Sequence, residues 1–209
     1  MPHRGLVLAL ALMGPALPPG APNAMSEETP ANPLLEEWTT PFAVPPFDRI
    51  RPEHFRPAFD AALAAARKDV EAVASRTGAP TFANTVEVLE LGGELLDRVD
   101  AVFSNLNSAE TNDELQAIAK EVAPLEAALR DDIYLNDALF ARVRAVWKKR
   151  DVLGLEPEQA RLLEETGKDF LRSGANLDAP SKARLREINK ELSVLTVTFA
   201  ENVLKETNT

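Results

Sequence analysis

The apolar residues of this chain recur every three to four positions, most regularly between Asp178 and Asn208. That spacing predicts an α-helix with one apolar stripe, and charged residues occupy the remaining surface. Asp178 is the predicted N-cap, and Pro180 falls in the first turn, where a missing N–H is harmless. We expect the rest of the fold to pack on this stripe, which consists of Leu185, Ile188, Leu192, Leu195, Phe199 and Val203.

The preceding segments also have helical periods. No stretch alternates β-branched and polar residues over the length of a strand. The predicted fold class is therefore all-α, with antiparallel helix hairpins packed on a long C-terminal helix. Capping residues and helix breakers place the starts of the earlier helices near Pro52, Thr81, Thr111 or Asn112, Asn136 and Pro157, and Gly174 ends the last of these.

Two features are expected to shape individual helices. Within a helix, Gly92 and Gly93 would each lower the helix stability by roughly 1 kcal/mol relative to alanine. A close contact with another helix at this pair would offset that cost. Pro124 removes one backbone hydrogen bond from the third helix and crowds the preceding turn, so we expect a kink there.

Proline separates the helices from the N-terminal part of the chain. Twelve of the 16 prolines lie at or before Pro57. Residues 25–51 are thus predicted to form an extended, proline-rich arm without a regular element. We expect the arm to be strapped onto the helical body, residues 52–209, because it contains the large apolar residues Leu34, Leu35, Trp38, Phe42, Val44 and Phe47.

Residues 1–24 form a separate leader. A basic start, an apolar run from Gly5 to Met13 and a Pro/Gly-rich stretch resemble a weak secretory signal, and the run is too short to span a bilayer. Pro22 occupies a position where cleavage requires a small residue. The favoured alternative is that Met25 is the true start and residues 1–24 are an untranslated upstream extension. The first interpretation places the protein in the periplasm and the second in the cytoplasm.

Composition excludes several classes of function. The net charge of -10 and the absence of a basic cluster argue against nucleic-acid binding. The chain has no cysteine, which excludes disulfides, thiolate catalysis and cysteine-based zinc sites. His3 and His54 are the only histidines, and neither has the second histidine one turn away that a helical zinc site requires.

Other polar groups are more economically explained as structural. We interpret His54 as a surface or capping residue, and Gly167-Lys168 lacks the rest of a phosphate-binding loop. The acidic doublets Glu36-Glu37, Asp131-Asp132 and Glu164-Glu165 are expected to face water. The polar segment 105–113 is expected to connect two helices and cap their ends, with a groove lining as its functional alternative. We therefore predict no catalytic, cofactor-binding or metal-ligating residue in this chain.

Several segments nevertheless carry a specific family resemblance, in the same order along the chain. They resemble the N-terminal region of the thimet-oligopeptidase-like zinc metallopeptidases, in particular the peptidyl-dipeptidase and oligopeptidase A group. The resemblance covers about Asn32 to Asn208. Its strongest parts are Asn32-Pro33-Leu34-Leu35, Trp38-Thr39-Thr40-Pro41-Phe42, residues 45–55, Asn84-Thr85, residues 103–108, residues 173–177, residues 184–189 and residues 199–204.

The resemblance implies an almost wholly helical protein in which two halves flank a deep channel. Its N-terminal helices limit access to short peptides, and its later half carries the zinc on an HExxH helix, which activates a water for peptide hydrolysis. This chain contains none of those positions, so the implied zinc belongs to the full-length family member. Gly167 departs from the family pattern, which has an aromatic residue there, and we expect that loss to loosen the fifth helix.

The leading hypothesis is thus a channel-wall and lid portion of a zinc peptidase, truncated before the catalytic half and inactive alone. It predicts exposed apolar surface along Leu192, Leu195, Phe199 and Val203, where the missing catalytic half would dock. The alternative is a stand-alone helical interaction module that binds a partner helix with the same stripe.

Overall fold

The computed structural model describes residues 31–207, which belong to one compact unit, and among them every regular element is helical. The all-α prediction is confirmed. The leader, residues 1–24, and the first part of the arm lie outside the described residues. The helices are α1 (Pro52–Ala74), α2 (Val88–Glu90), α3 (Glu94–Ala109), α4 (Asp113–Tyr134), α5 (Asp137–Trp147), α6 (Pro157–Arg172) and α7 (Ala179–Thr207), with shorter turns η1 (Pro41–Ala43), η2 (Phe82–Glu87) and η3 (Arg150–Val152).

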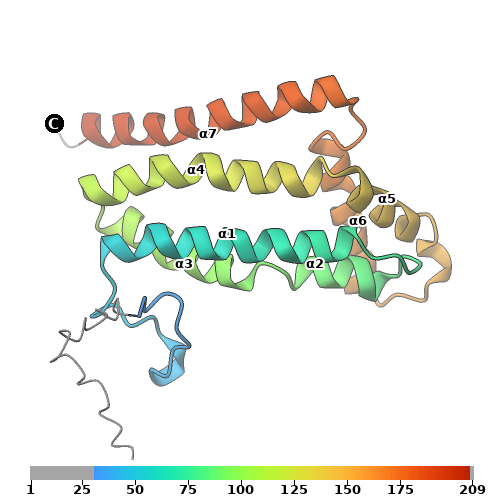
Figure 1. The fold of residues 1–209 in the computed structure, drawn as a ribbon, viewed down its shortest axis with the longest axis horizontal. Coiled ribbons are helices and arrows are strands. Elements are labelled where there is room, and N and C mark those ends of the chain that lie inside the picture. Colours follow the sequence, from blue (N-terminus) through green and yellow to red (C-terminus); the bar gives the residue numbers. More distant parts are fainter. Residues whose placement is uncertain (1–30, 208–209) are drawn as a thin grey trace, which may run out of the picture. The chain divides into compact units, whose positions relative to one another are not determined.

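Four long helices lie side by side in the order α3, α1, α4 and α7 (Figure 1). Helix α4 packs against α1 on one side and against α7 on the other. Helices α5 and α6 pack on each other at the end of the bundle where α7 begins (Figure 1). The predicted helix hairpins are therefore present, and α7 forms one outer layer.

Aromatic side chains fill the core between the helices. Phe103 of α3 meets the rings of Phe55 and Phe59 edge-on, with centroids 5.1 and 5.4 Å apart. At the other end, Phe170 of α6 lies between Tyr134 and Phe140, with centroids 5.1 and 5.8 Å away. These contacts bury aromatic side chains of α1, α3 and α6 in the core.

The predicted caps are also present. The side-chain oxygens of Asn112 and Asn136 each accept a 3.0 Å hydrogen bond from the backbone N–H three residues later. Asp178 accepts a 2.9 Å bond from Ser181 N–H in the same way. Gly174 has φ +97°, a conformation that glycine adopts without strain, and it ends the turn after α6.

The predicted second helix is interrupted at its glycine pair. The helical geometry ends at Leu91, and Gly93 adopts φ +84° as the residue before α3. A side chain at Gly93 would find open space, and one at Gly92 would first meet the carbonyl oxygens of its own preceding turn. A Cβ at Gly92 would also lie 3.7 Å from Cβ of Asp69 in α1, so the predicted contact with another helix is present at Gly92, whereas Gly93 serves a backbone reversal. Pro124 lies within α4, and a kink there stays a prediction.

The arm is attached to the body at specific points. Leu34 is fully buried, its carbonyl accepts a 3.0 Å hydrogen bond from Arg98, and that guanidinium lies 5.0 Å from the Trp38 ring. Phe42 and Phe47, in contrast, are exposed. The prediction that the arm is strapped down is thus correct for Leu34 and Trp38. It is wrong for Leu35, Phe42, Val44 and Phe47, which are exposed, although Ile50 at the end of the arm is buried in the core.

Helix α7 contacts α4 through a face that sequence analysis did not predict. The buried residues of α7 are Lys182 and Glu201, whereas the predicted inward stripe is largely exposed. At 100° per residue, Lys182 lies about a quarter of a turn and Glu201 almost half a turn from the centre of the stripe. The rotation follows from the polar contacts that α4 and α5 offer to α7, described below.

Gly167 of α6 lies against Trp147 of α5, and both line a cavity of about 300 Å³. A Cβ at this position would lie 3.1 Å from Cε3 of Trp147 in α5, so the indole ring already covers the glycine. The expectation that a missing aromatic residue loosens this helix stays a prediction.

Candidate functional site

The most distinctive surface of the molecule is the boundary between α7 and α4, which begins with a buried lysine. The Nζ atom of Lys182 donates a 2.6 Å hydrogen bond to Asp137 Oδ1 and a 3.2 Å bond to the carbonyl of Leu135. Burial of an ammonium group is costly unless it is paired and hydrogen-bonded. These two bonds therefore fix the start of α7 over the junction of α4 and α5.

The middle of α7 is held by the Asp131-Asp132 doublet. Asp132 accepts a 2.9 Å bond from Arg186 on α7, and it also forms a 3.4 Å ion pair with Arg67 on α1. Asp131 is buried and accepts a 2.6 Å bond from the amide of Asn189. The expectation that this doublet faces water is wrong for Asp131, because α7 covers it.

The far end of α7 is held by a second charged pair. Lys120 of α4 lies 2.6 Å from Glu201, whose side chain is almost completely buried. Polar contacts therefore occur near the start, the middle and the end of α7. Together they fix its rotation about its own axis.

The exposed stripe of α7 consists of Ile188, Leu192, Leu195, Phe199 and Val203, and we call it the outward stripe. Its exposed fraction runs from 43% at Ile188 to 70% at Phe199. Scattered apolar residues are normal on a protein surface, but a continuous row indicates an interaction site. The predicted exposure of Leu192, Leu195, Phe199 and Val203 is confirmed.

A groove of about 630 Å³ runs beside this stripe, between α4 and α7. Leu192 belongs to both the stripe and the groove, and Glu126 and Arg130 of α4 form part of the opposite wall. Burial, together with the smaller effect of the nearby Asp100 carboxylate, raises the pKa of Glu126 to about 7. The groove thus combines apolar surface with a carboxyl group that titrates near neutral pH.

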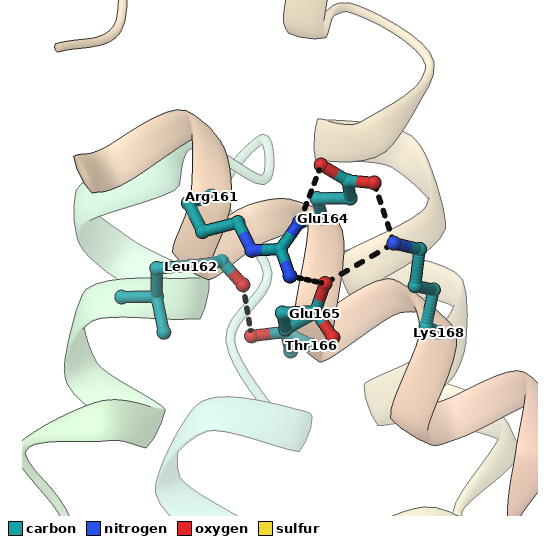
Figure 2. A network of polar contacts seen from close by, with 6 residues as sticks. All are labelled: Arg161, Leu162, Glu164, Glu165, Thr166 and Lys168. Atoms are coloured by element: carbon teal, nitrogen blue, oxygen red, sulfur yellow. Dashed lines mark hydrogen bonds and ion pairs between the residues drawn. The ribbon is translucent and has the colours of Figure 1, made fainter. Parts of the chain in front are cut away.

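The other acidic doublets form surface ion pairs. Figure 2 shows Glu164 and Glu165 on α6 between Arg161 and Lys168, with Lys168 contacting both carboxylates. The hydrogen bond from Lys168 holds the pKa of Glu164 below its ordinary value. Glu36 pairs with Arg49 at 2.9 Å. Both arrangements are structural, and Lys168 binds carboxylates of its own helix.

The remaining polar candidates act as caps. Nδ1 of His54 accepts a 3.0 Å hydrogen bond from Arg51 N–H at the start of α1, as predicted for a capping histidine. The segment 105–113 joins α3 to α4, and Asn107 accepts a 3.0 Å bond from the Thr111 hydroxyl. Asn112 also lines a small cavity of about 140 Å³ beside Phe55. The connecting role is thus confirmed.

Sequence analysis missed Arg142, the most extensively bonded side chain in this part of the fold. Its guanidinium donates to the carbonyls of Arg76 and Gly78, at 2.8 and 3.1 Å, and to Asn84 Oδ1 at 3.0 Å. Arg142 stands on the inward face of its helix, where an apolar residue is expected, and this feature of the sequence could have identified it. Arg142 holds the connection between α1 and η2 against α5.

The donor set for a metal is absent from residues 31–207, where no group of three His, Cys, Asp or Glu side chains is placed to hold an ion. The residues present therefore do not fit the zinc implied by the family resemblance. None of the described helices has the length and apolar character needed to cross a bilayer.

Comparison with known proteins identifies the relatives of this fold. The chain is 44% identical to the dipeptidyl carboxypeptidase of Salmonella typhimurium over 173 residues, which make up 83% of this chain and 25% of that protein. The chain is thus similar to the N-terminal region of the dipeptidyl carboxypeptidase and oligopeptidase A group. It is 31% identical to oligopeptidase A of Escherichia coli over 84% of its length, again 25% of the relative.

The resemblance recognised in the sequence is thereby confirmed. A probable cytosolic oligopeptidase A of Arabidopsis thaliana is 28% identical over 87% of this chain and 25% of its own length. The chain therefore spans about a quarter of the length of the relatives it matches. No protein-family model matches it.

Proposed function

We propose that this chain is the N-terminal channel-wall and lid portion of a zinc-dependent oligopeptidase or peptidyl-dipeptidase. The full-length protein would hydrolyse short peptides, and the chain alone would be inactive. The observation that supports this best is the 44% identity to a dipeptidyl carboxypeptidase over 83% of the chain, confined to 25% of that relative. A match of this extent indicates one structural portion of a larger enzyme.

This chain and the catalytic portion would have different roles in the full-length protein. Residues 52–209 would form the helical wall. The arm, residues 25–51, would brace that wall through Leu34 and Trp38. The catalytic portion would supply the zinc, and it is the principal partner that we propose. Short peptides would be the substrates, and we propose neither a nucleic-acid partner nor a membrane-spanning segment.

We also propose a cytoplasmic location. The name of the Arabidopsis relative, a probable cytosolic oligopeptidase A, agrees with this proposal. Periplasmic export is the alternative if residues 1–24 function as a signal peptide. N-terminal sequencing of the mature protein from its source distinguishes the two, because export predicts a start near residue 24 and loss of the apolar run.

A second candidate function is a stand-alone helical interaction module. The outward stripe favours it, since an exposed apolar row of this kind also suits a partner helix. This candidate predicts that the chain functions without any catalytic portion.

A chimeric enzyme tests the leading proposal. The matched segment of the Salmonella dipeptidyl carboxypeptidase is replaced by that of this chain, and release of dipeptides from a short peptide is measured together with zinc content. We expect an active chimera with bound zinc, and no activity or stoichiometric zinc in the 209-residue chain alone. An inactive but folded chimera, or tight one-to-one zinc binding by the chain alone, would contradict the proposal.

A further inference from the structure

The outward stripe has the residue types of a protein core, yet it lies on the surface of α7. Resting on the proposed function, we infer that an apolar helix from the catalytic portion of the same polypeptide packs on this stripe. The axis of that helix would lie nearly parallel to α7. The inference assigns a partner and a packing geometry to a named set of residues.

The first argument is that α7 cannot turn this stripe inward. Lys182, Arg186 and Asn189 bond to α4 and α5 along the first half of the helix, and Glu201 pairs with Lys120 near its end. Rotation that buries Phe199 against α4 would break all of these contacts and expose Asp131. The stripe is therefore left free for another surface.

The second argument concerns the shape of the partner. The stripe residues are separated by four, three, four and four positions. Spacings of three and four place them in a row almost parallel to the helix axis, the geometry of helices that cross at roughly 20°. The row from Ile188 to Val203 extends about 22 Å at 1.5 Å per residue. One helix of about four turns would cover it.

The third argument selects the catalytic portion as the occupant. The relatives are about four times as long as the segment this chain matches, so three quarters of their length must be accommodated around it. The stripe itself bears no charged residue, which favours an apolar and permanent contact over a transient one. A second copy of the chain is the competing occupant.

The experiment compares the same substitutions in two settings, the 209-residue chain and the chimeric enzyme. Leu195→Glu and Phe199→Glu place a carboxylate in the stripe. Val194→Glu is the matched control, because it makes the same chemical change about 100° around the helix from Leu195. Thermal unfolding is followed in all variants.

We expect all three variants to leave the melting temperature of the chain alone within about 2 °C. In the chimera, Leu195→Glu and Phe199→Glu should lower the melting temperature by about 5 °C or more, whereas Val194→Glu should not. Equal melting temperatures for all chimeras would overturn the inference. The melting temperatures can be compared whether or not the chimera cleaves peptide. An inactive but stable chimera would therefore contradict only the proposed function.

Two further measurements on the chain alone keep the inference testable if the chimera does not fold. An apolar fluorescent dye should bind the chain, and Phe199→Glu should reduce that binding at least twofold. Absence of dye binding would overturn the inference. Sedimentation should show a monomer, whereas a dimer dissociated by Phe199→Glu would assign the stripe to a second copy instead.

Discussion

The ammonium of Lys182, near the start of α7, lies 2.6 Å from the carboxylate of Asp137 in the first turn of α5. Lys182 is buried, whereas Asp137 is largely exposed. The lysine also donates to the Leu135 carbonyl at the end of α4. One side chain therefore links the ends of three helices.

Lys182→Met should lower the free energy of unfolding by about 1–2 kcal/mol, because the Leu135 carbonyl loses its buried donor while the apolar stem is kept. Asp137→Asn should have a smaller effect, since its side chain is mostly in water. Urea unfolding of the two variants measures the difference. Equal losses would mean that the ion pair, and not the carbonyl contact, holds α7.

Leu192→Asp is expected to be mild in this chain. Leu192 is 56% exposed, so a carboxylate at this position remains hydrated, and the loss should stay below about 1 kcal/mol. Val122→Asp in α4 is the matched change at a site with 2% exposure, and it should cost several kcal/mol. Thermal melts of both variants test the rotation of α7. A severe effect of Leu192→Asp would show that the stripe faces α4.

An aromatic residue at Gly167 should destabilise the protein. The Trp147 ring would lie 3.1 Å from a Cβ at this position, so Gly167→Phe forces two rings into one space and should cost about 1–3 kcal/mol. In a Trp147→Ala background the same substitution should be tolerated better, because the space is then open. A double-mutant cycle measures this coupling, and an absence of coupling would refute the packing of Trp147 on Gly167.

Stability should depend on pH through Glu126. Its pKa is about 7 in the folded protein against 4.5 for the ordinary carboxyl, so the folded state favours the protonated form. The resulting stabilisation is complete below pH 4.5 and is lost as the pH rises to about 7. Discounted for solvent screening, the change should be roughly 1–2 kcal/mol.

Glu126→Gln is the control for this pH dependence, because it keeps the shape of the side chain and removes the titration. The variant should lose much of the decline in unfolding free energy between pH 4.5 and 7 that the unsubstituted chain shows. If both chains give the same pH profile, another group is responsible.

Local sequence signals were sufficient for the helices themselves. Asn112, Asn136 and Asp178 cap the helices they were predicted to cap, because the bond from a cap residue to the N–H three positions later involves only neighbouring residues. Phe55 and Phe59 of α1, and Leu163 and Phe170 of α6, recur at helical spacing and are buried. The all-α class and the helical order could thus be derived from the chain alone.

The rotation of α7 and the packing at Gly167 depended on residues distant in sequence. The apolar stripe of α7 was recognised correctly, but its direction was decided by Asp131, Asp132 and Asp137, more than 40 positions earlier. The indole of Trp147 likewise occupies space that no feature of α6 reveals. Periodicity determines which residues share a face of a helix, because that is a property of the helix alone. Which face turns inward depends on the free energies of packing each face against all the surfaces available, and only the tertiary structure determines these.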